Sequence, residues 1–217
     1  MGYRVNMKLE KLKNKTAKLL VFEKKSLKLL EKDDNNLSAN LKYWLKSGDL
    51  IALKKGLYIF KDKYEKESSK NEYLEFLANK LLSPSYLSLE YVLDKYSLLS
   101  ESARTLTSVS DKAAREFSNS LGVWRYYSLP KKLFSGYKIK YFKGQPIFEA
   151  SKAKALFDFL YLRFRRGSEP SEKSFSNLRL NLENLTEKDR AELFSYFKSV
   201  PEKRFQKLKK IIEKYAV

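Results

Sequence analysis

The sequence of 217 residues contains no cysteine and no histidine. Without cysteine the chain can form neither a disulfide bond nor a thiolate metal site, which fits a reducing compartment. Without histidine it lacks the commonest general base and the usual zinc ligand, so carboxylates, lysines and hydroxyl groups are the only candidate catalytic groups. We therefore expect a protein that is not an enzyme and that holds no metal and no cofactor.

Long apolar runs are missing as well. No stretch of about eighteen apolar residues occurs in the sequence. Residues 1–6 are followed by lysines rather than by the apolar segment of a signal peptide. These two absences predict a soluble, cytoplasmic protein without a membrane partner.

Positive charge, by contrast, is abundant. The chain has 45 lysines and arginines against 26 aspartates and glutamates, a formal net charge of +19. A polyanion gains affinity with each phosphate that is neutralised and each counterion that is released, so nucleic acid is the first partner to consider. The alternative is a lysine-rich surface on which the charge only solvates the protein. The excess is densest in residues 1–63, which carry 16 basic against 7 acidic side chains.

The N-terminal part of the chain has the apolar spacing of a helical domain. Hydrophobic residues make up 43% of the whole chain, which is enough to fill a core. The positions of the leucines predict three helices, over residues 8–20, 25–30 and 35–47. Asn35 or Asn36 can cap the third helix, and Gly48 can end it.

A β-hairpin is expected directly after these helices. Two apolar runs between residues 50 and 60 flank the tight basic tip Lys54-Lys55-Gly56. Three helices followed by a basic hairpin are typical of a winged helix-turn-helix. We therefore assign residues 1–63 to a winged helix-turn-helix DNA-binding domain.

The rest of the chain has the pattern of a second domain, over residues 71–217. A charged stretch at residues 62–70 reads as a linker. Beyond it we expect an amphipathic helix and a short apolar segment, then a helix and three strands, at residues 73–82, 86–89, 90–96, 105–109, 124–128 and 137–142. Residues 150–164 are apolar on nearly every side, which predicts a helix at the centre of this domain.

Residues 164–217 are expected to form a helical extension. Thr186 and Asp189 have the spacing of a capping box at the start of one helix. Pro201 can occupy the first turn of the last helix. The predicted fold class is therefore α+β, an N-terminal winged helix-turn-helix followed by a mixed α/β domain that ends in helices.

Three short segments carry a resemblance to a known family. The first is Tyr43–Leu50 leading into Lys54–Tyr58, the second is Pro84–Glu90 and the third is Lys154–Asp158. In this order and spacing, over residues 15–165, they resemble the AbiEi-type antitoxins of type IV, abortive-infection toxin-antitoxin systems. Two dipeptides depart from the family pattern: Ser97-Leu98 replaces glycine-leucine, and Lys152-Ala153 replaces proline-glutamate.

The resemblance implies both a regulatory and a protective function. It implies a repressor that binds repeats in double-stranded DNA upstream of its own operon. It also implies an antitoxin that counteracts a nucleotidyltransferase toxin encoded beside it, without a stable complex, in phage defence. The alternative is a winged-helix transcriptional regulator whose C-terminal domain binds a ligand or protein unrelated to toxins. A basic nuclease or RNA-processing enzyme is a third possibility.

The candidate DNA-binding residues lie on the third helix and the hairpin. Asparagine suits adenine and lysine suits guanine, so base edges are expected to be met by Asn36, Ser38, Asn40 and Lys42. Phosphates are expected to be held by Tyr43 and Lys46, and by Lys54 and Lys55 at the hairpin tip. Each of these residues could instead be an ordinary solvated position.

Two further groups of charged residues stand out. A second basic surface for nucleic acid or a partner is predicted at Arg163, Arg165, Arg166, Lys207 and Lys210, although solvated helix ends are the simpler interpretation. Lys154 and Asp158 are four residues apart on one helix face, and we expect an internal salt bridge between them rather than chemistry.

The sequence lacks the residues that a nucleotidyltransferase or a metal-dependent nuclease would need. A nucleotidyltransferase needs a glycine-serine turn followed by paired aspartates that hold magnesium, and Gly167-Ser168 is followed by no such pair. A metal-dependent nuclease needs clustered carboxylates with a lysine, and Glu149 with Lys152 is too isolated to form one.

Overall fold

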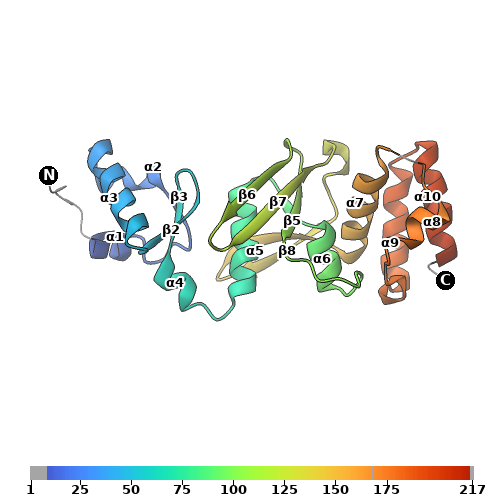
Figure 1. The fold of residues 1–217 in the computed structure, drawn as a ribbon, viewed down its shortest axis with the longest axis horizontal. Helices are drawn as coiled ribbons and strands as arrows, with labels where there is room; N and C mark the ends of the chain where they lie inside the picture. The colour runs from blue at the N-terminus through green and yellow to red at the C-terminus, as the bar shows by residue number, and fades with distance from the viewer. Residues whose placement is uncertain (1–8, 168, 216–217) are drawn as a thin grey trace. The chain divides into compact units, whose positions relative to one another are not determined.

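The structure, a computed structural model, describes residues 9–167 and 169–215 of the chain. The fold is mixed α+β, and Figure 1 labels most of its helices and strands. The chain divides into two compact units. Unit 1 comprises the described residues up to Leu77 together with Phe117–Gly122, and unit 2 comprises Ala78–Glu116 and the described residues from Val123 onward. The boundary falls within helix α5, whereas the sequence pattern started the second domain at residue 71.

Unit 1 contains short helices around a three-stranded antiparallel sheet of order β1-β3-β2. Its elements are α1 (Leu9–Lys15), β1 (Phe22–Glu23), α2 (Lys24–Leu27), α3 (Asp34–Lys46), β2 (Leu50–Lys54), β3 (Leu57–Phe60), α4 (Lys61–Glu65) and the first part of α5 (Lys70–Leu81). The expected hairpin is confirmed, and Gly56 forms its turn with a φ of 81° that other residues rarely adopt.

Several expectations for this unit were wrong in detail. Helices α1 and α2 are shorter than expected, and residues 62–70 contain α4 rather than only a linker. The break between the first two helices is strand β1, whose Phe22 pairs with Tyr58. Two residues give too short a pattern for a strand to be recognised.

The cap of α3 also differs from the expected one. Its N-cap is Asp33, whose carboxylate accepts hydrogen bonds from the backbone nitrogens of Asn35 and Asn36, at 2.8 and 3.1 Å. A carboxylate accepts hydrogen bonds from two free backbone amides and also interacts favourably with the positive end of the helix dipole. Asp33 is therefore a better N-cap than the neutral Asn35 or Asn36.

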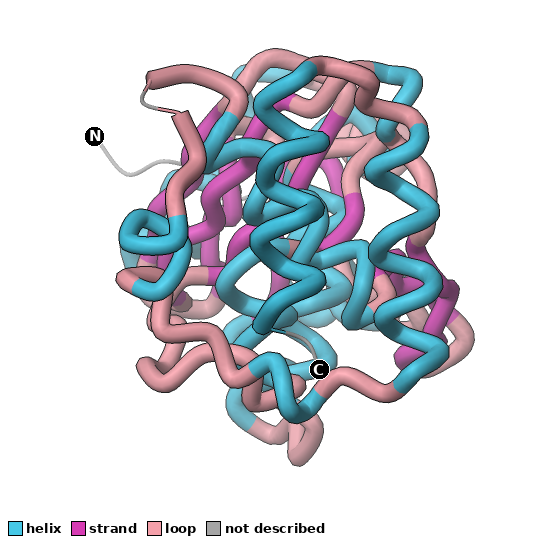
Figure 2. The backbone as a smooth tube through the Cα atoms, turned by 90° about the vertical axis from the view of Figure 1, so that its right-hand side faces the viewer, coloured by secondary structure: helices cyan, strands magenta, loops and turns pink. Residues whose placement is uncertain are grey.

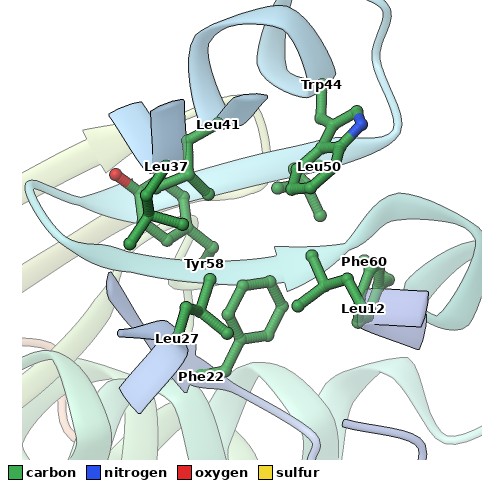
Figure 3. Packing of buried hydrophobic residues seen from close by; sticks show 9 residues of the cluster. All are labelled: Leu12, Phe22, Leu27, Leu37, Leu41, Trp44, Leu50, Tyr58 and Phe60. Atoms are coloured by element: carbon green, nitrogen blue, oxygen red, sulfur yellow. The ribbon is translucent and has the colours of Figure 1, made fainter. Parts of the chain in front are cut away.

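A compact apolar core holds unit 1 together. Figure 3 shows nine buried side chains that gather between α1, α3, the hairpin and the segment of β1 and α2, namely Leu12, Phe22, Leu27, Leu37, Leu41, Trp44, Leu50, Tyr58 and Phe60. Leu37, Leu41 and Trp44 come from one stripe of α3, so this helix is fixed against the sheet by one face and presents the other outward.

The larger sheet is six-stranded and mixed, with the order β6-β7-β5-β4-β9-β8, and it belongs to unit 2 except for residues 117–119 and 122, which group with unit 1. Its strands are β4 (Tyr86–Leu87), β5 (Leu106–Ser110), β6 (Arg115–Asn119), β7 (Gly122–Ser128), β8 (Tyr137–Phe142) and β9 (Gln145–Ala150), with α6 (Leu89–Lys95) after β4. The three expected strands are confirmed as β5, β7 and β8. Strands β6 and β9 were missed, because β6 is mostly exposed and polar and β9 carries a proline and a buried glutamate.

Helix α7 (Lys152–Phe164) is largely buried, as its apolar sequence predicted. It is followed by α8 (Glu172–Ser176), α9 (Glu187–Lys198) and α10 (Lys203–Tyr215). Helices α7, α9 and α10 contact one another, and Figure 2 shows helices standing side by side at this end of the chain. The capping box of Thr186 and Asp189 is confirmed. Pro201 precedes α10 instead of lying in its first turn.

A buried polar network lies at the centre of unit 2. Lys154 and Asp158 are both fully buried, and Lys154 Nζ lies 2.5 Å from Asp158 Oδ1, which confirms the expected salt bridge. Asp158 Oδ2 accepts hydrogen bonds from the hydroxyls of Tyr86 (2.9 Å) and Ser88 (2.8 Å). Lys154 Nζ also donates to the carbonyl oxygen of Leu133 at 2.8 Å. The network therefore ties β4, the segment after it and the loop before β8 to α7.

Burial and pairing act in opposite directions on these charges. Burial raises the pKa of Asp158, while the ion pair with Lys154 and the hydroxyl donors oppose that rise. Burial likewise lowers the pKa of Lys154, and Asp158 opposes that change. Each charge is therefore tolerated in the interior because the other is in contact with it.

Removing one partner of this pair should be strongly destabilising. Asp158→Asn leaves the ammonium group of Lys154 buried without its carboxylate, and we expect the free energy of unfolding to fall by about 3 kcal/mol. Urea denaturation followed by circular dichroism measures this change. Glu213→Gln is the control, since Lys209 and Glu213 form a pair with the same spacing, 3.5 Å apart, in which Lys209 is half-buried and Glu213 is exposed. Its loss should stay below about 0.5 kcal/mol, and equal small losses in both variants would contradict the expectation.

Candidate nucleic-acid interface

The outer face of α3 presents most of the residues that the sequence singled out. Lys42, Lys46 and Ser38 are exposed, and Tyr43 is 56% exposed although it is a large aromatic residue. Asn36 is half-buried. These side chains follow the helix on the side away from the core, so they can reach a partner that lies along it.

Asn40 is the exception, and its assignment to the DNA-binding face was wrong. It is 1% exposed, and its Nδ2 has no hydrogen-bond partner among the described residues. The reason is its spacing, since residue 40 lies three positions after Leu37 and four before Trp44, on the stripe that packs on the sheet. The polarity of the side chain suggested the outer face, but the helical period places it inside.

The N-terminal end of α3 is joined to α2 by charged groups. Asp34 lies 2.9 Å from the ammonium group of Lys24 and 3.2 Å from that of Lys28. The hydrogen bonds from Lys24 and Lys28, in that order, hold the pKa of this carboxyl below its ordinary value. Lys24 also donates to Ser38 Oγ at 2.9 Å. The negative charge of Asp34 is thereby compensated by two lysines.

A groove of about 550 Å³ opens beside these contacts, between α2, the start of α3 and the hairpin tip. Five lysines and two carboxylates line it together with Gly56 and Leu57, namely Lys24, Lys25, Lys28, Lys54, Lys55, Glu23 and Asp34. The excess of cations in one concave surface concentrates positive potential where an anion can enter.

The two tip lysines differ in their surroundings. Lys55 is exposed, whereas Lys54 is half-buried and its ammonium group lies 5.7 Å from the centre of the Phe117 ring. The sequence predicted both residues but missed Lys24, Lys25 and Lys28. No sequence signal could have found them, because their place depends on the two-residue strand β1. Its pairing with β3 brings the start of α2 to the hairpin tip, where the amide of Lys24 donates to the carbonyl of Gly56 at 2.9 Å.

Four of the five residues of the predicted second basic surface are exposed. Arg163 and Arg166 are exposed, as are Lys207 and Lys210 on α10. Arg165, however, is half-buried and donates to the carbonyl oxygen of Ser128 at 3.0 Å. It therefore fixes the end of α7 to the sheet, and its assignment to a binding surface is corrected. No contact places the other four residues in one patch within the part of the chain that the structure describes.

The described residues offer little to a catalytic metal. Residues 9–167 and 169–215 contain no group of three or more carboxylates that could hold a metal ion. Glu149, weighed as part of a nuclease site, is buried and contacts the ammonium groups of Lys95 (2.9 Å) and Lys140 (2.5 Å). Of the Gly167-Ser168 pair, Ser168 lies outside the described residues. Within the same ranges, no helix has the length and apolarity needed to cross a bilayer.

Comparison with known proteins adds no assignment to this geometry. No family model matches the chain, and no curated protein matches it. The interface is therefore argued from its own residues.

The burial of Asn40 leads to a test that separates packing from recognition. Asn40→Leu replaces an amide whose Nδ2 has no hydrogen-bond partner among the described residues by an apolar side chain of similar size, so we expect the free energy of unfolding to rise by about 1 kcal/mol. Urea denaturation measures it. Asn35→Leu, on the exposed side of the same helix, should change stability by less than about 0.5 kcal/mol. A destabilised Asn40→Leu protein would mean that the amide makes a polar contact that the fold needs.

Proposed function

We propose that this chain binds double-stranded DNA through unit 1, which acts as a winged helix-turn-helix with α3 in the major groove. The observation that carries the proposal is the lysine-lined groove directly beside the exposed polar face of α3. Phosphates line both edges of the major groove of a duplex. Cations beside a helix that enters the groove can therefore contact these phosphates. Lys24, Lys25, Lys28 and Lys55 flank the N-terminal end of α3 in this way.

The roles of the individual residues follow from their chemistry. Lys42 and Ser38 are exposed in the N-terminal and middle part of α3 and are proposed to meet base edges, with Lys42 suited to guanine. Tyr43 and Lys46 are proposed to hold phosphates by a hydroxyl and an ammonium group. Lys55 at the hairpin tip is proposed as a backbone contact.

We further propose that the protein is an autorepressor and antitoxin that counteracts a nucleotidyltransferase toxin. This proposal rests on the resemblance to the AbiEi-type antitoxins. It gains support because two of the three resembling segments, Pro84–Glu90 and Lys154–Asp158, meet in the buried network of Tyr86, Ser88, Lys154 and Asp158. These two segments, which are distant in the sequence, are therefore held together by direct contacts. Growth rescue on coexpression with a nucleotidyltransferase encoded beside it tests the antitoxin function.

The DNA-binding proposal is tested with DNA from directly upstream of the gene. Fluorescence anisotropy at one fixed salt concentration should show tighter binding to this DNA than to a scrambled duplex of equal length. Lys42→Ala should reduce that preference by about tenfold or more, because one base contact is lost. Lys46→Ala is the matched variant on the same helix, and it should weaken binding to both duplexes alike. Equal affinity of the unaltered protein for both duplexes would argue against a repressor.

The groove lysines should control the salt dependence rather than the sequence preference. Lys25→Ala combined with Lys55→Ala removes two phosphate contacts, so the slope of log affinity against log salt should decrease by about two. Affinity for the upstream and scrambled duplexes should fall by the same factor. The control is Lys188→Ala with Lys198→Ala, two exposed lysines of α9, which should leave the slope unchanged. An unchanged slope in the groove variant would remove the groove from the interface.

A further inference from the structure

Unit 2 contains a cavity that the DNA-binding proposal does not use. It has a volume of about 470 Å³ and lies between the loop Leu99–Ala103, the residues Glu90 and Phe159 of α6 and α7, and the segment Asn177–Arg179. The loop and the segment are held together, because Leu99 and Leu180 form an isolated antiparallel bridge and the amide of Asn181 donates to the carbonyl of Leu98 at 3.1 Å. A cavity of this volume can enclose a small molecule.

Four of the ten residues that line the cavity are apolar and form one part of its wall, while the other six are polar or charged. Leu99, Phe159 and Leu178 are each half-buried and line it, together with Ala103. When an apolar ligand covers accessible apolar side chains in a concave surface, apolar area is removed from water, which favours binding. The wall therefore favours a ligand with an apolar body.

Glu90 is the polar lining residue with an unsatisfied buried atom. Its Oε2 is buried without a hydrogen-bond partner among the described residues. Removing a carboxylate oxygen from water without a compensating donor is unfavourable for the free protein. If the carboxylate turns toward the cavity, a ligand with a cationic donor can form a charge-assisted hydrogen bond with it.

Backbone strain is found at the same place. Leu89, directly before Glu90, has a φ of 62°, and Arg179 at the rim has a φ of 49°. Residues with a side chain rarely adopt this left-handed conformation, which tends to persist where the surroundings hold a binding site in shape.

We propose that this cavity binds a small monoamine, a molecule with one ammonium group on an apolar body. The ammonium group donates to Glu90, and the body packs against Phe159 and Leu178. Arg179 and Glu101 are exposed and also line the cavity, and their opposite charges balance, so one ammonium group on the ligand matches the charge of Glu90. The site does not depend on the proposed DNA binding, since it is contained in unit 2.

The test compares amines with alcohols of the same shape. Phenethylamine and cyclohexylamine are titrated against the full chain by isothermal titration calorimetry, alongside phenethyl alcohol and cyclohexanol. At least one amine should bind saturably, and at least tenfold more tightly than its alcohol. Glu90→Gln should weaken that amine at least tenfold, whereas Glu183→Gln, an exposed carboxylate outside the cavity, should not change its affinity.

A second measurement separates binding from a purely structural role of Glu90. Because the buried oxygen has no hydrogen-bond partner in the part of the chain that the structure describes, Glu90→Gln should unfold at the same or a higher urea concentration while it loses amine binding. Failure of both amines to bind, equal affinity for amine and alcohol, or a Glu90→Gln protein that is destabilised would each overturn the proposal. Its outcome is independent of the DNA titrations, which use unit 1 residues.

Discussion

In unit 2 the ammonium group of Lys154 is enclosed by protein, and its charge is tolerated because the carboxylate of Asp158 lies 2.5 Å away. The carboxylate is fixed in turn by the hydroxyls of Tyr86 and Ser88, and the ammonium group by the carbonyl of Leu133. A buried pair of charges is stable only where geometry and hydrogen bonds are both complete. The network therefore fixes the positions of β4, of the loop before β8 and of α7 relative to one another, and the surrounding sheet and helices are built around those positions.

In unit 1 the core cluster around α3 and the hairpin is apolar, although Asn40, Glu67 and Glu75 are also buried in this unit. Lysines of unit 1 line the groove between α2, the start of α3 and the hairpin tip. Carboxylates are present there too, but Asp33 is occupied as a helix cap and Asp34 by two lysines. The groove has five lysines against two carboxylates, so it keeps an excess of positive charge. Unit 2 thus encloses an ion pair in its interior, whereas unit 1 gathers lysines around an accessible groove.

Much of this organisation was visible in the sequence, and the errors have physical causes. Long periodic segments such as α3 and α7, the hairpin of unit 1 and the Lys154–Asp158 pair were predicted, because period, turn residues and four-residue spacing are local signals. Strand β1 was missed because two residues give too short a pattern, β6 because it is mostly exposed and polar, and β9 because it carries a proline and a buried glutamate. Asn40 and Arg165 were misplaced because their polarity was weighted above their spacing. The groove required β1, and the cavity around Glu90 required tertiary contacts between residues 90 and 179 that sequence reasoning could not supply.

The composition of the lysine groove has a consequence for how it responds to its surroundings. Its ionisable groups are ammonium and carboxylate groups, and the chain has no histidine to change charge near neutrality. A shift of one or two pH units around neutral therefore leaves the positive potential of this surface in place, whereas added counterions screen it directly. The electrostatic potential of the groove in unit 1 consequently depends on the ionic strength and little on the pH near neutrality.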